Sequence, residues 1–386
     1  MLYFDNAATS WPKAPGVSDA MKYYIDNIGV NINRGVYAPA QEAGLKALTL
    51  REQLAAFFHH PDPDHVIFTS GCTAALNLAL KGFLRPGDHV LVSSLEHNAV
   101  MRPLVQLGVE FDRVPCDKEG FLRLDLIEPL LRPNTRLFVL NHASNVSGSV
   151  QDAETVGKLC KLHRIALLLD VAQSAGHVPV DFERFGLSAL AVPAHKGLLG
   201  PQGIGALLVT PEFAAQMEPL LAGGTGSMSD SEEIPAYMPD RFEPGTANLP
   251  GIYGWSAAMD YVNQAGLEAL RSHELALTER FLNGLPEGVR LKGTRDLNRR
   301  VGVIALDYVN QDNAEAADRL ERDFGILTRC GMHCSPAAHK ALGTFPQGVV
   351  RFSVGHATTE ADVDAALQAI AATANGSGKE AGTHVF

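Results

Sequence analysis

The chain has 386 residues, which is too long for one small core, so we expect two lobes. Its composition, 46% hydrophobic and 19% charged, is that of an ordinary globular protein, and its formal net charge of −11 argues against a nucleic-acid surface, which needs clustered basic side chains. The apolar runs are too short to span a bilayer, and the first residues lack the basic start and apolar run of a signal peptide.

The cysteines are few and odd in number, which suits a reducing compartment better than a disulfide framework. We therefore expect a cytoplasmic protein with free thiols, at Cys72, Cys116, Cys160, Cys330 and Cys334.

Between about residues 60 and 210, short apolar runs alternate with helical patterns. This alternation predicts an α/β fold whose large domain has a mainly parallel, seven-stranded sheet covered by helices. Helices are predicted at 73–84 and 153–163. The predicted strands span residues 66–70, 89–94, 109–115, 136–142, 165–170, 189–194 and 204–209.

The remaining third of the chain indicates a smaller α+β domain. A helical pattern starts near Gly254, and strands at 301–308 and 348–354 alternate with helices near 313–324 and from Thr359. We expect an N-terminal segment (1–20) that packs on this small domain, a large domain (21–253), a small domain (254–374) and a disordered Gly- and Ser-rich tail (375–386).

Two polar clusters follow predicted strands, where open α/β sheets bind their ligands. Gly71-Cys72-Thr73 lies between the strand at 66–70 and a helix, and free N–H groups at a helix start form an anion site suited to phosphate. An ordinary capped helix is the alternative. His97 follows the strand at 89–94. A single histidine at a strand end is usually an ordinary polar residue, so His97 is a site candidate only because of the other clusters.

Two further clusters carry stronger chemistry. Asp170 ends an apolar strand, where a carboxylate is costly unless a cation or hydrogen bond stabilises it, although an N-cap is the equal alternative. Lys196, preceded by His195, lies on a Gly-rich turn one strand later; it is either solvated or an amine able to act as nucleophile and base. A phosphate site, a buried carboxylate and a lysine together match the needs of pyridoxal phosphate. The rival nicotinamide site lacks a GxGxxG motif.

The segments DVAQSAGH (170–177) and AHKGLLGPQG (194–203) resemble the class V aminotransferases, in the branch of cysteine desulfurases and selenocysteine lyases. The similarity runs from YFDNAAT (3–9) to VRFSVG (350–355). It implies the fold-type I architecture of pyridoxal-phosphate enzymes and a homodimer with active sites at the subunit interface.

The resemblance also implies roles for single residues around the cofactor. Lys196 would carry the cofactor beside His195, and Asp170 would pair with the pyridine nitrogen. His97 would stack on the ring and also be a catalytic residue, as a base available to the Cys334 thiol. The other cofactor-binding residues it implies are Asn145 and Gln173 near the phenolic oxygen, Gly71, Cys72 and Thr73 at the phosphate, and Thr246 reaching the partner subunit's phosphate.

For the substrate, the resemblance implies that Arg351 binds the carboxylate, assisted by Asn145 and Arg34. Cys334, directly after His333 in a compact loop, would take sulfur from L-cysteine as a persulfide, leave L-alanine, and pass the sulfur to an acceptor protein. The alternatives are a selenocysteine lyase, another class V C–S lyase or aminotransferase, or, from a different class, a non-catalytic sulfur-carrier scaffold.

The chain departs from the family pattern at three places. Pro193 stands where a serine is usual, three residues before Lys196, and His356-Ala357-Thr358 replaces a tyrosine-asparagine-threonine ending. Near the N-terminus, Asn33-Arg34-Gly35 stands where the family often has His-Arg-Gly. Cys330, Cys334, His333 and His339 also suggest a zinc site, but they lack the paired Cys-x-x-Cys spacing of structural sites, so we expect no metal.

Overall fold

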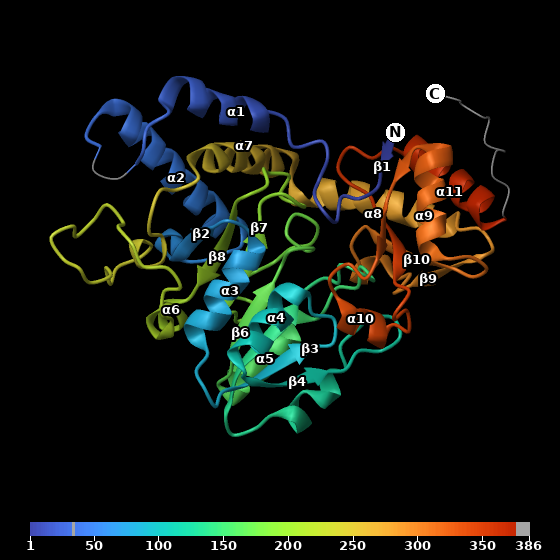
Figure 1. Cartoon of the computed structure of the whole chain (residues 1–386), viewed down its shortest axis with the longest axis horizontal. Helices are drawn as coiled ribbons and strands as arrows, with labels where there is room; N and C mark the ends of the chain where they lie inside the picture. Colours follow the sequence, from blue (N-terminus) through green and yellow to red (C-terminus); the bar gives the residue numbers. More distant parts are fainter. Residues whose placement is uncertain (33–34, 376–386) are drawn as a thin grey trace.

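The computed structural model describes residues 1–32 and 35–375 (Figure 1). Arg34 and residues 376–386 of the predicted disordered tail lie outside the described residues. A large domain with a central sheet lies beside a smaller domain formed mostly by the last third of the chain. Within the described ranges, no helix has the length and apolar character needed to cross a membrane.

The large domain contains a seven-stranded sheet, as the sequence predicts, and its strand order is β2-β8-β7-β6-β5-β3-β4. Each strand lies within one residue of its predicted bounds. They are β2 (Val66–Thr69), β3 (His89–Ser93), β4 (Glu110–Val114), β5 (Thr135–Asn141), β6 (Ala166–Asp170), β7 (Ala189–Pro193) and β8 (Gly205–Val209). The order confirms an α/β fold in which the ends of β6 and β7 are neighbours.

One strand of this sheet, β8, runs against its neighbours β7 and β2, whereas the other pairings are parallel. The loop between β7 and β8 contains Lys196 and spans residues 194–204. A parallel return needs a crossover of a dozen or more residues, usually a helix. The chain therefore returns as the antiparallel strand β8, and the short loop that contains Lys196 stays close to the strand ends.

Both faces of the sheet are buried, as expected for a mainly parallel sheet covered by helices. Along β3 the side chains alternate between two cores: Leu91 packs in one, and Val90 and Val92 pack in the other. The covering helices of the large domain are α1 (Val17–Tyr23), α2 (Ala38–Phe57), α3 (Cys72–Phe83), α4 (Asn98–Leu107), α5 (Ala153–His163), α6 (Pro211–Gln216) and α7 (Leu249–Ala265).

The helix predicted to start near Gly254 begins five residues earlier and is two helices, α7 and α8 (Leu267–Asn283). Asn248 starts α7, because its side chain accepts the N–H of Gly251. Gly266, with φ 80°, separates the two helices. Trp255 packs in the large core, and so the predicted boundary at residue 253 falls inside a large-domain helix; we propose Gly266 as the boundary.

The small domain packs an antiparallel sheet, in the order β12-β13-β10-β9, against three helices. Its first residues come from the opposite end of the chain: β1 (Leu2–Tyr3) pairs in parallel with β11 (Ile326–Leu327). The other elements are β9 (Val289–Lys292), β10 (Val303–Tyr308), β12 (Arg329–Gly331), β13 (Val349–Ser353), α9 (Asn313–Phe324), α10 (Pro336–Ala341) and α11 (Glu360–Ala374).

Candidate active site

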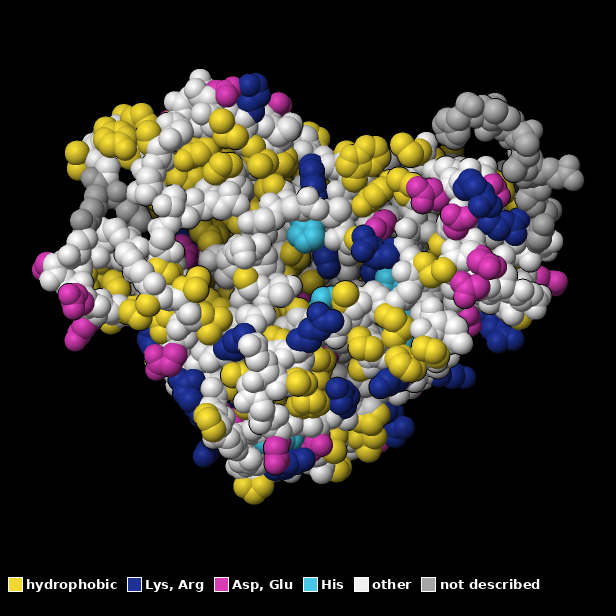
Figure 2. Space-filling view, viewed as in Figure 1, with side chains coloured by type: hydrophobic (Ala, Val, Ile, Leu, Met, Phe, Trp, Pro, Cys, Tyr) yellow, Lys and Arg dark blue, Asp and Glu magenta, His cyan; other side chains and the backbone are white. Residues whose placement is uncertain are grey.

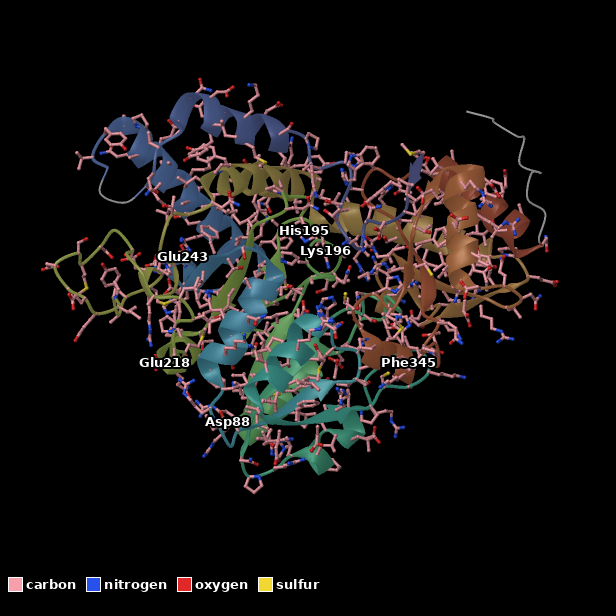
Figure 3. All side chains as sticks on the ribbon, in the orientation of Figure 1. Asp88, His195, Lys196, Glu218, Glu243 and Phe345 are labelled. Atoms are coloured by element: carbon pink, nitrogen blue, oxygen red, sulfur yellow. The ribbon has the colours of Figure 1, made fainter. Side chains whose placement is uncertain are left out.

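A cavity of about 410 Å³ lies beyond the carboxyl ends of β6 and β7. Figure 3 places His195 and Lys196 there, in the middle of the molecule where the two domains face each other. The surface is hollowed at this place, and histidine and basic side chains gather in the hollow (Figure 2). Nine predicted site residues line the cavity: Gly71, Cys72, Thr73, His97, Asn145, Asp170, Gln173, His195 and Lys196.

The start of α3 forms one wall of this cavity. Gly71 has φ 146°, a backbone conformation that residues with a side chain rarely adopt, and it turns the chain from β2 into the helix. The neighbouring strand approaches closely, since a Cβ at Gly205 would lie 2.8 Å from Cα of Gly71. The first N–H groups of a helix have no partner within it, and those of α3 are therefore available to an anion.

Asp170 and Lys196 face the cavity from adjacent strand ends. The Asp170 carboxylate is buried and accepts hydrogen bonds from the backbone N–H of Ala172 (2.8 Å) and from the Cys72 thiol (3.6 Å). Burial raises the pKa of that thiol well above its usual range, so Cys72 stays protonated and donates. Burial also lowers the pKa of Lys196, although the negative charge of Asp170 opposes this shift.

The imidazole of His97 caps α4, with Nδ1 accepting the N–H of Ala99 at 3.0 Å. Burial lowers the pKa of His97, which favours the neutral ring. The preceding residue, Glu96, was not predicted as a site residue. Its carboxyl accepts hydrogen bonds from Ser93 (2.6 Å) and from the backbone of Asn141 (2.7 Å), and burial raises its pKa to about 8. Burial thus favours the neutral form of Glu96, which carries no negative charge beside Asp170.

Cys334 and Arg351 do not line the cavity but reach it through Asn145. The Asn145 side chain donates to the carbonyl of His333, next to Cys334, at 2.7 Å. The backbone carbonyl of Asn145 accepts from Arg351 at 3.1 Å. The Cys334 side chain is exposed, whereas Arg351 is buried. The nucleophile candidate and the carboxylate-binding candidate are therefore linked to one cavity residue.

Asp5 lies between two arginines and was also missed from the sequence. It accepts from Arg351 (2.9 Å) and, with both oxygens, from Arg329 on β12. Burial lowers the pKa of Arg351, and the Asp5 carboxylate opposes that shift. Asp5 is part of the YFDNAAT motif, so the motif was visible, but nothing in the sequence showed its partner 346 residues away.

Two predicted site residues lie elsewhere. Thr246 is exposed and lines a neighbouring cavity of about 640 Å³, which shares Ser70, Ala74 and Asn77 with the Lys196 cavity. Arg34 is outside the described residues. Among the residues that the structure does describe, no cluster of three or more His, Cys, Asp or Glu side chains is arranged to hold a metal ion.

Comparison with known proteins agrees with this geometry. Residues 2–366 match the family model of the class-V aminotransferases. A probable cysteine desulfurase of Methanothermobacter thermautotrophicus is 32% identical over 371 residues, which cover 94% of this chain and 92% of that protein. A cysteine desulfurase of Yersinia pseudotuberculosis is 32% identical over 380 residues, 94% of this chain and 91% of that protein.

Among solved structures, the apo form of a cysteine desulfurase from Thermococcus onnurineus superposes with a TM-score of 0.90 at 31% identity. The match covers 97% of this chain and 95% of that one. Since the family model, the relatives and the solved structure all span nearly the whole chain, this protein belongs to the class-V aminotransferase family.

Proposed function

We propose that this chain binds pyridoxal phosphate in the Lys196 cavity and is a cysteine desulfurase, which converts L-cysteine to L-alanine and moves the sulfur to Cys334. The observation that carries this proposal is that one cavity joins a lysine, a buried carboxylate and the start of a helix. The named relatives support the substrate class, because they are cysteine desulfurases by name.

The residues of the cavity fit this cofactor. The start of α3 offers N–H groups to the phosphate, the Asp170 carboxylate offers an acceptor to the pyridine N–H, and the Lys196 amine can hold the aldehyde carbon. Pro193 has no hydroxyl to give to the phosphate, so Thr73 and the helix start carry that role. When bound, pyridoxal phosphate supplies an electron sink for the substrate's Cα.

The chain's own groups then hold the substrate and move its proton. A planar guanidinium matches a carboxylate bidentately, and Arg351 is held rigidly by Asp5 and the carbonyl of Asn145. Lys196, whose pKa is lowered by burial, takes the Cα proton as the general base. The low pKa of His97 keeps that ring neutral, so it does not compete as a cation beside Lys196.

Cys334 takes the sulfur. As a thiolate, its Sγ attacks the sulfur of L-cysteine, an S–S bond forms, and the substrate's Cβ–S bond breaks. The Cβ atom then takes a proton, and Lys196 returns the proton that it took from Cα, which completes L-alanine. The persulfide remains on an exposed side chain. A dedicated acceptor protein, or a reductant in the assay, removes the sulfur from that position.

We further propose that two copies of the chain form a dimer over the 640 Å³ cavity. Large apolar side chains are exposed around it, and a second copy is the occupant that the family resemblance implies. Thr246 lines this cavity and not the Lys196 cavity of its own chain, which supports a role across the interface. The exposed leucines that line it are Leu48, Leu220 and Leu221.

The direct test is to incubate the purified protein with L-cysteine and a reductant and to quantify alanine and sulfide. We expect the two products in equal amounts. Pyruvate and ammonia in place of alanine would indicate a C–S lyase that eliminates, and amino transfer to a keto acid would indicate an aminotransferase. Turnover of selenocysteine without turnover of cysteine would indicate a selenocysteine lyase.

Lys196→Ala should abolish this activity and remove the visible absorbance band of the covalently held cofactor, because no other lysine lines the cavity among the described residues. Absorbance spectra of the purified variant measure this directly. Lys158→Ala, on the exposed face of α5, is the control and should keep the band. An unaltered band in Lys196→Ala would contradict the assignment.

A further inference from the structure

The turn that carries Cys334 has an unfavourable backbone conformation. His333 and Cys334 have φ 48° and 57°, both in the left-handed region, although neither is a glycine. Residues with a side chain rarely adopt this conformation, and it persists only where surrounding contacts hold them. Three hydrogen bonds hold this turn: from the N–H of Asn98 to the carbonyl of Cys334 (2.7 Å), from Ser335 to Met332 (2.9 Å), and from the side chain of Asn145 to the carbonyl of His333 (2.7 Å).

The third of these bonds depends on which way the Asn145 amide is turned. The His333 carbonyl can only accept, so the Nδ2 end of the amide must face it. The hydroxyl of Ser335 donates to the other end, Oδ1, at 2.8 Å, and Ser335 is fully buried. Together the two contacts fix the orientation of an amide that also lines the cavity.

The consequence reaches the cavity, because an amide nitrogen has two hydrogens. One is used on His333, and the second remains for an acceptor such as a carboxylate or phenolate oxygen. The backbone of Asn145 is held separately, by the bond from Arg351 to its carbonyl. The orientation of the side chain, rather than its position, is therefore what Ser335 controls.

We propose that Ser335 is a positioning residue: by donating to Asn145, it makes one amide both tether the Cys334 turn and present an N–H to the cavity. Without that hydroxyl the amide can turn over, and its oxygen then faces the carbonyl of His333, so the tether is lost. As far as it concerns sulfur transfer, this inference rests on the proposed function; the tether itself does not.

The first test measures backbone hydrogen exchange in peptides that span residues 329–336, without substrate. In Ser335→Ala, the bond from Asn145 to the His333 carbonyl should be lost. A net hydrogen bond contributes about 0.5–1.5 kcal/mol, so exchange in this peptide should become roughly two- to tenfold faster. Ser256→Ala is the matched control, since Ser256 is also fully buried and also donates to a side-chain amide, Gln53 (3.0 Å), away from the cavity. It should leave exchange in 329–336 unaltered.

A second variant keeps the test valid if Ser335→Ala fails to fold. Asn145→Asp keeps the shape of the side chain but has no N–H for His333, so exchange in 329–336 should rise as in Ser335→Ala. If exchange in this peptide is unaltered in both variants, the tether does not exist and the inference is wrong.

The second test separates a positioning role from a merely structural one. We expect Ser335→Ala to lower kcat for alanine formation about three- to tenfold, yet to have no further effect in an Asn145→Ala background, because it acts through that amide. Additive losses in the double variant would overturn the proposal. A wild-type protein that forms no alanine would count against the proposed function only, since the exchange experiment needs no substrate.

Discussion

Cys330 and Cys334 lie four residues apart but in different surroundings. Cys334 is exposed on the left-handed turn, whereas Cys330 is half-buried against the small-domain core and pairs with Val350 across β12 and β13. Burial raises the pKa of Cys330, so its reactive thiolate form is disfavoured.

We therefore expect that the sulfur taken from L-cysteine becomes bound to Cys334. Alkylation, digestion and mass spectrometry after treatment with L-cysteine should locate the added mass there. Cys334→Ala should lose sulfide release while its cofactor absorbance stays, and Cys330→Ala should keep most activity. Added sulfur found only on Cys330 would contradict this assignment and favour the lyase alternative.

Arg351 provides a second prediction at this scale. Its buried guanidinium is held by Asp5, and removing one partner of a buried charge pair costs roughly 2–5 kcal/mol. Arg351→Ala should therefore lower kcat/KM by about one and a half to three and a half decades, and Arg351→Lys should restore it only in part. Arg329→Ala, which removes the half-exposed partner of Asp5, should cost less than about tenfold. Near-normal kcat/KM in Arg351→Ala would show that the carboxylate binds elsewhere.

At the scale of elements, α8 is tied to the loop after β6. Glu274 on α8 is buried; one of its oxygens contacts His177, and the other accepts the N–H of Gly302 at 2.7 Å. The backbone carbonyl of His177 accepts from Arg271 on the same helix at 3.0 Å. The ring of His177 also leaves no room for a side chain beside Lys196, since a Cβ at Gly197 would lie 2.5 Å from its Nε2.

This contact predicts a pH dependence of stability. Burial lowers the pKa of His177, but Glu274 outweighs it, so the net shift is upward. A raised folded-state pKa means that the stabilisation is complete below the ordinary histidine value of about 6.5 and is lost as pH rises through the folded-state pKa. Glu274→Gln should thus lower the unfolding free energy by about 3 kcal/mol at pH 6 and by less at pH 9.

Thermal or denaturant unfolding at the two pH values measures this difference. Asp364→Asn, which breaks an exposed ion pair with Arg280 on α8, is the control; it should leave the unfolding free energy nearly unaltered at both pH values. An equal loss at pH 6 and pH 9 in Glu274→Gln would show that His177 is not charged in the folded protein.

The elements themselves were largely predictable, because each is encoded locally. The strands of the large sheet are predicted by apolar runs such as 165–170. The start of α11 is marked by Thr359, the N-cap residue of a capping box. The break at Gly266 and the early start of α7 were missed, since a helical pattern continues across both. The contacts of Asp5, Ser335 and Glu274 were not predictable, because each links residues that are far apart in sequence and no local pattern reports such a pairing.

At the scale of the whole molecule, the exposed leucines around the larger cavity predict the assembly. Leu221→Asp places a charge in the proposed interface and should convert a dimer to a monomer and reduce activity. Light scattering after size exclusion measures the mass. Leu162→Asp is the matched control, because Leu162 on α5 is 70% exposed and Leu221 is 71% exposed. A dimer that survives Leu221→Asp would mean that the interface lies elsewhere.

The contact between Phe4, which follows β1, and Ser353 on β13 has a consequence for how the protein folds. The N–H and the hydroxyl of Ser353 both donate hydrogen bonds to the backbone carbonyl of Phe4. The two residues are 349 positions apart in the sequence. Contacts of such sequence separation form slowly, because a very long loop must close first. During synthesis, the large domain can fold before Arg351 is made, so the contact of Arg351 with Asn145 forms only after β13 has been translated. We therefore expect a nascent chain to lack desulfurase activity until its last strand emerges from the ribosome.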